Sequence, residues 1–449
     1  MNIVIVGAGS VGRALSEKLS RNGHDVSLID SNADRVREIS ETLDVHVLCG
    51  NGSTSPGLRR AGIEKADLVV AVTNRDEVNM VVGVLASLAF EVSRIIVRLR
   101  DADHAEGMER ICQEHKGEHV WVNPDVAAVD RIASLLEVPG AVDVVSFMDG
   151  ELIVAGFRIG QSSDFVGVRV SDLNLLFAAA PTLAVAIRRL EDWIIPHGGE
   201  EIGVGDLVYF AIAREHLSDV LPLFGVEPDQ RRGIMIAGAG PIGLELARRL
   251  ESIDVKTIMI EEDDELARQA SEELADTLVV RGLVTEKALL EEEDISRIAT
   301  FVAVTPDHET NLVAGLLAKR LGAGRAVVLV DNPALVDLVG QIGIDAIISP
   351  RLLVIGLALQ HILGGRVRSV AQLLEDRIEI VETEATKRSR LAKGTLPEIK
   401  LPRGVLVAAL QRGEKLLVPR GADRVEHGDR VLLITTSENA AKLADFLAE

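Results

Sequence analysis

Short apolar runs alternate along the chain with longer segments in which apolar residues recur at helical spacing. In the first half these runs cover residues 2–6, 26–30, 45–48, 68–73, 95–99 and 119–122. In the second half they cover 234–237, 257–260, 277–280, 301–305, 326–330 and 346–348. Because strands separated by helices pair in parallel through right-handed crossovers, the pattern predicts two doubly wound α/β sheets.

The two halves of the chain also repeat each other in sequence. IVIVGAGSVG at 3–12 returns 231 positions later as IMIAGAGPIG at 234–243. After one inserted residue the displacement becomes 232, for example between Thr73 and Thr305. A register kept over this length predicts that one structural unit occurs twice.

A second repeat follows each predicted sheet. Strand patterns at 182–188 and 206–211, with Pro and Gly turn signals between them, predict a compact, β-rich α+β module. Its matched pairs, each 223 positions apart, are Arg189 and Arg412, Glu191 and Glu414, Pro196 and Pro419, Gly198 and Gly421, Gly205 and Gly428, and Asp206 and Asp429.

These repeats predict a unit made of a Rossmann-like domain and a small α+β subdomain, and this unit occurs twice in the chain. We place the first copy's Rossmann-like domain at 1–124, a helical linker at 125–139 and the small subdomain at 140–225. The corresponding parts of the second copy are 231–350, 351–366 and 367–449. The apolar helices after Pro124 and Pro350 are expected to join the two parts of each copy and to act as hinges.

The glycine-rich turn of the first copy lies directly between a strand and a helix, as dinucleotide binding requires. Gly7 permits the tight turn, Gly9 lets a diphosphate approach the backbone, and Gly12 lets the helix pack on the strand. Amides at the helix start would hold the phosphates. Asp30 ends the second strand, where a carboxylate accepts hydrogen bonds from ribose hydroxyls and disfavours a 2′-phosphate. The expected ligand is NAD/NADH or ATP/ADP rather than NADP.

Further polar residues follow the other strands of the first copy, at the sheet edge where such folds bind ligands. They are Asn51, Gly52, Thr73, Asn74 and Arg98. An arginine there pairs well with phosphate, although a surface or interface ion pair explains Arg98 equally well. The glycines have a structural alternative too, since they also serve a tight turn that binds nothing.

The second copy keeps the glycine turn and a carboxylate, Glu261, but fewer of the other polar residues. Leu283 stands in the place of Asn51, Pro306 in that of Asn74, and Val330 in that of Arg98. We therefore expect a second site with fewer polar contacts.

Composition and missing motifs narrow the function. The formal net charge of -21 argues against nucleic acid as a partner. Cys49 and Cys112 are the two cysteines, so no disulfide framework or zinc set is expected, and no signal peptide or span of about 18 apolar residues is found. Metalloprotease, P-loop and hydrolase motifs are absent from the sequence. These features predict a soluble, cytoplasmic protein that is not an enzyme.

Several stretches closely resemble the RCK or KTN domains, which regulate potassium transport. The resemblance rests on GAGSVG with Asp30, on LCGNGSTSPGLRRAGIEKADLVVAVTNRDEVNM, and on the strand IIVRLRD. The small modules, with WIIPHGGEEIGVGDLVYF and LLVPRGADRVEHGDRVLLI, look like the family's C-terminal subdomain. Order, spacing and duplication agree over nearly the whole chain.

The resemblance implies a regulatory subunit that binds NAD(H) or ATP/ADP and forms a homo-oligomeric ring, as a dimer or tetramer. It would act at the cytoplasmic face of the inner membrane on a Trk-type potassium-translocating membrane subunit. The implied ligand residues of the first copy are Gly7, Ala8, Gly9, Ser10, Val11, Gly12, Asp30, Asn51, Gly52, Thr73, Asn74 and Arg98. Those of the second copy are Gly238, Ala239, Gly240, Pro241, Ile242, Gly243, Glu261, Gly282 and Thr305.

Two other function classes fit the sequence less well. An NAD-dependent oxidoreductase with duplicated cofactor domains would need an acid/base group presented to the nicotinamide, and the small modules offer no candidate. A scaffold with vestigial sites would show no stabilisation by a nucleotide.

Overall fold

The protein is described from a computed structural model of residues 1–449. The structure describes all of these except 113–116, 178–179, 191, 225–230, 332–342, 364–366, 374–377, 388, 403, 420–422, 440–441, 444–445 and 448–449. Glu191 and Gly421, two members of the sequence repeat, therefore lie outside the described residues. The chain divides into two compact units, Met1–Ala127 with Pro350–Gly364, and Ala128–Ser349 with Gly365–Glu449.

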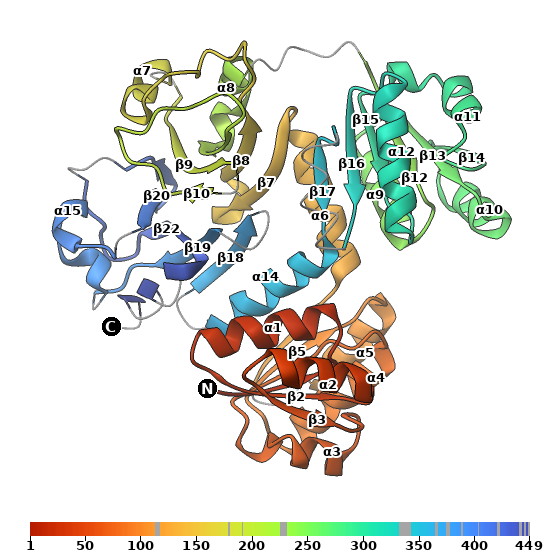
Figure 1. Ribbon diagram of the computed structural model, residues 1–449, viewed down its shortest axis with the longest axis vertical. Coiled ribbons are helices and arrows are strands. Elements are labelled where there is room, and N and C mark those ends of the chain that lie inside the picture. Colours follow the sequence, from red (N-terminus) through yellow and green to blue (C-terminus); the bar gives the residue numbers. More distant parts are fainter. Residues whose placement is uncertain are drawn as a thin grey trace. The chain divides into compact units, whose positions relative to one another are not determined.

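The first unit is built on a six-stranded parallel sheet in the order β3-β2-β1-β4-β5-β6 (Figure 1). Its strands are β1 (Asn2–Val6), β2 (Asp25–Asp30), β3 (His46–Cys49), β4 (Leu68–Ala71), β5 (Arg94–Arg98) and β6 (Glu118–Val122). Its helices are α1 (Ser10–Arg21), α2 (Ala33–Thr42), α3 (Ser55–Arg60), α4 (Asp76–Val84), α5 (Ala102–Cys112) and α14 (Pro350–Leu363). The order confirms the predicted doubly wound sheet.

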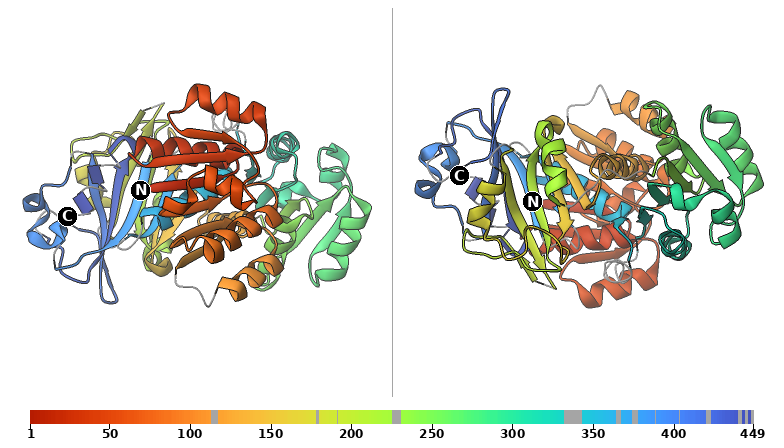
Figure 2. Two further views of the ribbon diagram at one scale, coloured as in Figure 1. Left: turned by 90° about the horizontal axis from the view of Figure 1, so that it is seen from below. Right: turned by 90° about the horizontal axis from the view of Figure 1, so that it is seen from above.

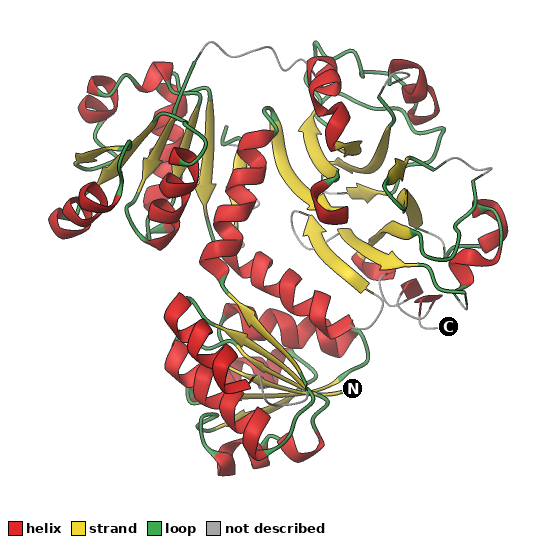
Figure 3. Cartoon of the chain, turned by 180° about the vertical axis from the view of Figure 1, so that it is seen from behind, coloured by secondary structure: helices red, strands yellow, loops and turns green. Residues whose placement is uncertain are grey.

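Helices cover both faces of this sheet (Figure 3). On one face, Leu15 and Leu19 of α1 share a core with Val354 and Leu359 of α14. On the other face, α3 and α4 bury residues such as Leu58 against the strands. The α14 helix begins at Pro350, in the second copy of the sequence repeat, so the first sheet is completed by a helix of the second copy.

The second unit contains the repeated parallel sheet, in the order β14-β13-β12-β15-β16-β17. Its strands are β12 (Ile234–Ala237), β13 (Thr257–Glu261), β14 (Leu278–Arg281), β15 (Thr300–Ala303), β16 (Arg325–Leu329) and β17 (Ala346–Ile348). Its helices are α9 (Pro241–Glu251), α10 (Asp264–Glu273), α11 (Lys287–Glu292) and α12 (His308–Arg320), together with most of α6 (Pro124–Glu137).

Two five-stranded antiparallel sheets complete the second unit, in the orders β10-β9-β11-β8-β7 and β18-β19-β22-β20-β21. Their strands are β7 (Ala141–Phe147), β8 (Leu152–Arg158), β9 (Thr182–Arg189), β10 (Asp192–Ile194), β11 (Leu207–Ala213), β18 (Val367–Leu373), β19 (Ile378–Glu384), β20 (Val405–Arg412), β21 (Lys415–Leu417) and β22 (Arg430–Thr436). Short helices α7 (Leu173–Leu176), α8 (Leu217–Val220) and α15 (Leu396–Ile399) accompany them. The two sheets lie side by side (Figure 2) and share one apolar core. Tyr209 and Ile434 are fully buried in this core.

The repeated Arg and Asp of the small modules form the same ion pair in each. Arg189 donates to both carboxylate oxygens of Asp206 at 3.0 and 2.7 Å, and Arg412 does so to Asp429 at 2.9 and 2.8 Å. Both carboxylates also accept a backbone N–H from three residues before them. The second sequence repeat is therefore explained by an ion pair that holds a loop against the sheet in each module.

An arginine at the start of each fifth sheet strand binds the crossover helix of the other copy. Arg94 donates to the carbonyl of His361 in the last turn of α14. Arg325 donates to the carbonyl of Leu135, in the last turn of α6, at 2.7 Å. Carbonyls there lack partners within the helix, so a guanidinium satisfies them. The two crossover helices are thus exchanged between the copies.

Candidate functional site

Two glycines of the first glycine-rich turn are required by the fold. Gly7 has φ of +109°, and a Cβ there would lie 2.9 Å from the backbone nitrogen of Thr73. A Cβ on Gly12 would lie 1.8 Å from the carbonyl oxygen of Gly7, because α1 packs directly on the turn. Any side chain at either position would force the helix away from the sheet.

Gly9 has a different role from its neighbours. Its φ of -72° suits any residue, and a Cβ there would meet nothing within 4 Å. It is the N-cap of α1, and no side chain caps that helix start. Uncapped amides at the positive end of a 12-residue helix favour an anion, so the space beside Gly9 fits a phosphate group.

The second turn repeats this geometry closely. Gly238 has φ of +108°, and a Cβ on Gly243 would lie 2.0 Å from the carbonyl oxygen of Gly238. Gly240 again faces open space, and α9 starts without a side-chain cap. Pro241 occupies the first position of α9, where a missing N–H group breaks no hydrogen bond of the helix.

The carboxylate at the end of the second strand anchors the glycine turn in each copy. Asp30 accepts the backbone N–H groups of Ala8 at 2.6 Å and of Asn32 at 2.7 Å. Glu261 accepts that of Ala239 at 2.6 Å and that of Asp263 at 2.9 Å. A carboxylate offers about four acceptor positions, so each keeps capacity for ribose hydroxyls. Asp30 is half-buried whereas Glu261 is only 9% exposed, which leaves the first copy's carboxylate more accessible.

A buried asparagine that sequence reasoning missed ties two strand ends together. The Oδ1 atom of Asn79 accepts the backbone N–H of Thr73 at 2.9 Å and its hydroxyl at 2.7 Å. Its Nδ2 atom donates to the carbonyls of Thr73 and Arg98 at 3.0 Å each. Asn311 makes the same four contacts, with Thr305 and Leu329 as partners. The signal was present, because Asn79 and Asn311 match at the displacement of 232.

These contacts also correct the alignment of the two copies. The sequence put Val330 opposite Arg98, but Leu329 takes the position of Arg98 in the asparagine network. The segment between the buried asparagine and the end of the fifth strand is one residue shorter in the second copy. The displacement between equivalent residues of the two copies therefore returns from 232 to 231. An apolar residue still replaces the arginine.

The other predicted residues of the first copy lie around the same sheet edge. A Cβ on Gly52 would lie 2.4 Å from Val6, so this glycine is fixed by packing beside the ends of β1 and β2. Asn51 is exposed, and its side chain accepts the backbone N–H and hydroxyl of Ser53. Asn74 is exposed in the loop after β4.

Arg98 lies near a group of charged residues after β5. Burial raises the pKa of the Asp125 carboxyl above its ordinary value, and the charges of Arg100 and Arg98 act in the opposite direction. Arg98 therefore interacts electrostatically with Asp125. This interaction agrees with the interpretation of Arg98 as part of an ion pair, and a phosphate contact remains the alternative.

The remaining predicted residues divide by exposure. Ser10 and Pro241 are exposed at the helix starts, whereas the Val11 and Ile242 side chains are buried in the sheet cores. Val11 therefore has only its backbone to offer a ligand. In the second copy, Gly282 donates its N–H to the carbonyl of Glu261 at 2.9 Å, as Gly50 does to Asp30.

Over the residues that the structure describes, no cluster of His, Cys, Asp and Glu is arranged to hold a metal ion. Within the same residues, no helix combines the length and apolar character needed to cross a bilayer.

Comparison with known families gives matches over most of the chain. The TrkA-N domain family matches residues 3–115 and again 234–350, and the TrkA-C domain family matches residues 380–448. The first TrkA-N match covers β1 to β5 of the first parallel sheet, and the second covers β12 to β17 of the other.

Two curated relatives align along nearly their whole length. The Trk system potassium uptake protein TrkA of Azorhizobium caulinodans is 32% identical over 447 residues, covering 99% of this chain and 98% of the relative. The protein of the same name from Halomonas elongata is 36% identical over 438 residues, covering 96% and 95%.

A solved structure shares the fold. The GsuK RCK domain matches with a TM-score of 0.61 at 19% identity, covering 100% of this chain and 95% of that one. The GsuK channel bound to NAD matches with a TM-score of 0.60, also at 19% identity, covering 100% and 79%. These likenesses establish the RCK-type fold.

Proposed function

Since the chain belongs to the family of the Trk system potassium uptake protein TrkA, we propose that it is a regulatory subunit for potassium transport. In this proposal it binds NAD(H) or ATP/ADP at the glycine turns and acts on a Trk-type potassium-translocating membrane subunit. It would do so from the cytoplasmic face of the inner membrane, as a homo-oligomeric ring. The domain boundaries set out from the sequence belong to the same proposal.

The observation that carries the proposal is the open start of α1. Gly7 and Gly12 are held by packing, but Gly9 faces empty space beside uncapped helix amides and the anchored carboxylate of Asp30. A diphosphate fits the helix start, and an adenosine ribose fits the carboxylate. Binding would alter the transporter only if one conformation of the ring took the nucleotide more tightly than another.

Asp30→Ala is expected to weaken nucleotide binding at the first site by about 1.5 to 3 kcal/mol, because charge-assisted ribose contacts are lost. Calorimetric titration with NADH and with ADP measures this directly. Glu261→Ala is the matched variant, since it removes the same kind of anchor from the other turn. Unchanged affinity in Asp30→Ala would remove this carboxylate from the binding site.

The rival oxidoreductase makes an opposite prediction for NADH. A regulator binds NADH and leaves it intact, whereas an oxidoreductase transfers its hydride to a substrate. Prolonged incubation with NADH and a panel of small carbonyl compounds is expected to leave the NADH absorbance unchanged. Steady NADH oxidation that depends on one of these compounds would favour the enzyme.

The purified chain is expected to be a dimer or tetramer, because apolar side chains on α4 and its continuation stay exposed. Val81 and Leu88 are 43% and 41% exposed, and Val313, the counterpart of Val81 in the second copy, is 54% exposed. Repeated apolar patches favour symmetric association. Light scattering at micromolar concentration tests this, and a monomeric mass would contradict the ring.

A further inference from the structure

A cavity of about 820 Å³ lies in the second unit, away from the glycine turn. It opens at the amino ends of the parallel strands, where Ile234, Thr300 and Arg325 begin β12, β15 and β16. Leu136 of α6 and Val142 of β7 contribute to its other walls. Sites for small molecules commonly enclose about 300 to 1,000 Å³, so the cavity has the size of a ligand site.

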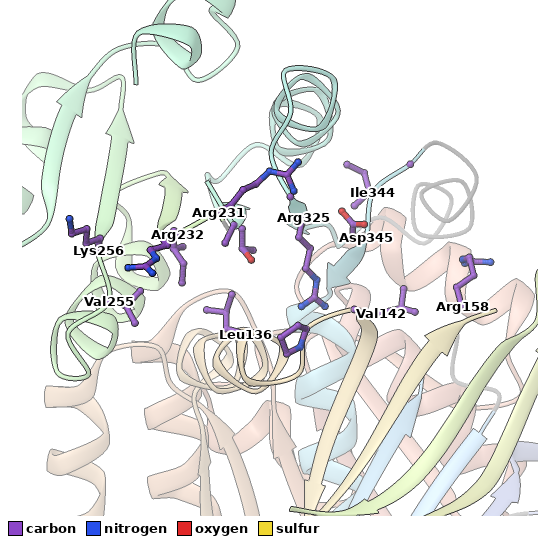
Figure 4. A pocket seen from close by; sticks show the side chains of 18 of the residues that line it. Leu136, Val142, Arg158, Arg231, Arg232, Val255, Lys256, Arg325, Ile344 and Asp345 are labelled. Carbon is purple, nitrogen blue, oxygen red and sulfur yellow. The ribbon is translucent and has the colours of Figure 1, made fainter. Parts of the chain in front are cut away.

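Among the charged side chains that line this cavity, cations outnumber carboxylates (Figure 4). The lining cations are Arg158, Arg231, Arg232, Lys256 and Arg325, and the lining carboxylates are Asp254 and Asp345. The carboxylate of Asp345 lies 3.0 Å from the ammonium of Lys319 and accepts the backbone N–H of Ala326. Because these two groups already bind it, Asp345 offsets the lining cations less than a free carboxylate would. A basic concavity in a chain of net charge -21 concentrates anions locally.

Arg325 is the buried member of this group, at 8% exposure. Its guanidinium donates to the carbonyls of Leu135 and Ala141, both uncharged groups. Burial lowers the pKa of Arg325 to about 10, opposed only in part by the charge of Asp345. A buried cation with neutral partners stabilises an anion placed close to it.

The equivalent arginine of the first copy has a carboxylate within 4 Å, whereas the charge of Arg325 is offset only in part, by Asp345. Arg94, the counterpart of Arg325, lies 3.6 Å from Glu118, which pairs with it across β5 and β6. The register of β16 and β17 pairs Val327 with Ala346, and extending it by two residues puts Ile344 opposite Arg325, in the place of that glutamate. An arginine caps the crossover helix in both copies, so capping does not explain why Arg325 lacks the ion pair that Arg94 makes.

Two other cations also occur in the second copy alone. At the displacement of 231, Arg232 corresponds to Met1, and Lys256 corresponds to Asp25. The parallel sheet is the same in both copies, so the fold does not demand these charges. We propose that this cavity binds a polyphosphate chain, free or carried by a nucleoside, at the cations of Arg232 and Lys256 beside Arg325.

Apolar residues complete the proposed site. Leu136, Val142, Val255 and Ile344 line the cavity and offer a surface for a nucleoside. Because the lining joins the parallel sheet to the end of α6 and the start of β7, a bound anion would tie these elements together. This inference does not depend on nucleotide binding at the glycine turns.

Calorimetric titration of the full chain with tripolyphosphate and with ADP tests the proposal. The titrated protein is a full-length variant with Gly9→Asp and Gly240→Asp. These substitutions block the glycine turns and leave the cavity intact. Both ligands are expected to bind this chain, and adding Arg232→Gln with Lys256→Gln should weaken them about a hundredfold, or about tenfold per cation. The matched control neutralises Arg248 and Arg268, which are exposed and lie outside the lining.

Ile344→Glu gives an independent test, because it restores the carboxylate that the first copy places beside its arginine. It should weaken both ligands about as strongly as the two neutralisations while the chain still unfolds cooperatively. If ADP binds more tightly than tripolyphosphate, the apolar wall contacts the nucleoside. If the two affinities are equal, the site recognises the phosphate groups alone. Loss of all binding with the glycine turns blocked, or affinities unaffected by the cavity variants, would overturn the proposal.

Discussion

Gly9→Asp is expected to reduce NADH or ATP affinity at the principal site by about a hundredfold while leaving the fold intact. The added side chain enters space that contains no atom within 4 Å, and φ at this position suits any residue. Aspartate is also a favoured N-cap, so α1 should gain a few tenths of a kcal/mol. Its carboxylate then occupies and repels the phosphate position. Calorimetry for binding and thermal unfolding for stability separate the two effects.

Gly240→Asp is the matched control for that experiment, because Gly240 caps α9 with the same open geometry. We expect this variant to affect a weaker site, since Glu261 is more buried than Asp30 and Leu329 replaces Arg98. If binding survives Gly9→Asp and disappears with Gly240→Asp, the ranking of the two sites is wrong.

Asn79→Leu is expected to destabilise the protein by about 3 kcal/mol, the largest stability effect that we predict. Leucine has a similar volume but leaves the backbone N–H and carbonyl of Thr73 and the carbonyl of Arg98 without the partner that Asn79 supplies. Scanning calorimetry measures the loss. Asn311→Leu should behave alike in the second copy, where the same contacts recur.

Asn74→Ala provides the nearby control, because Asn74 is exposed in the loop just after Thr73. A change within about 0.5 kcal/mol is expected there. If Asn79→Leu costs no more than Asn74→Ala, the asparagine does not hold the strand ends together.

The sequence predicted the parallel sheets well because their signals are local. Apolar runs lie within a residue or two of the observed strands, and the glycine pattern identified the turn between β1 and α1. The steric roles of Gly7 and Gly12 follow from the motif, since both positions leave no room for a Cβ. The open space at Gly9 follows from the same motif, so the steric features of the turn could be predicted without a structure.

Features that depend on distant contacts could not be predicted in this way. Asn79 lies mid-helix, and its role appears only when two strand ends come within hydrogen-bond distance of it. The exchange of α6 and α14 also leaves no local signal, because either helix is apolar enough to cover either sheet. The hydrogen bonds from Arg94 and Arg325 show which helix lies on which sheet.

The cations of the cavity also give no local signal in the sequence. Arg232, Lys256 and Arg325 are separated by up to 93 positions and look like ordinary surface charges in the sequence. Parallel strands bring their amino ends to one edge, and only then do the charges accumulate. Comparison of the two copies becomes informative at that stage, because Glu118 and Ile344 occupy matching positions.

The central claim is that the first glycine turn binds an adenine nucleotide for regulation. Its most direct test is calorimetric titration of the full chain and of Gly9→Asp with NADH, ATP, ADP and NADP. We expect saturable binding of NADH or of ATP and ADP to the unmodified chain, weaker binding of NADP, and about a hundredfold loss at the principal site in Gly9→Asp. Binding of every nucleotide with the same affinity in both proteins would contradict it.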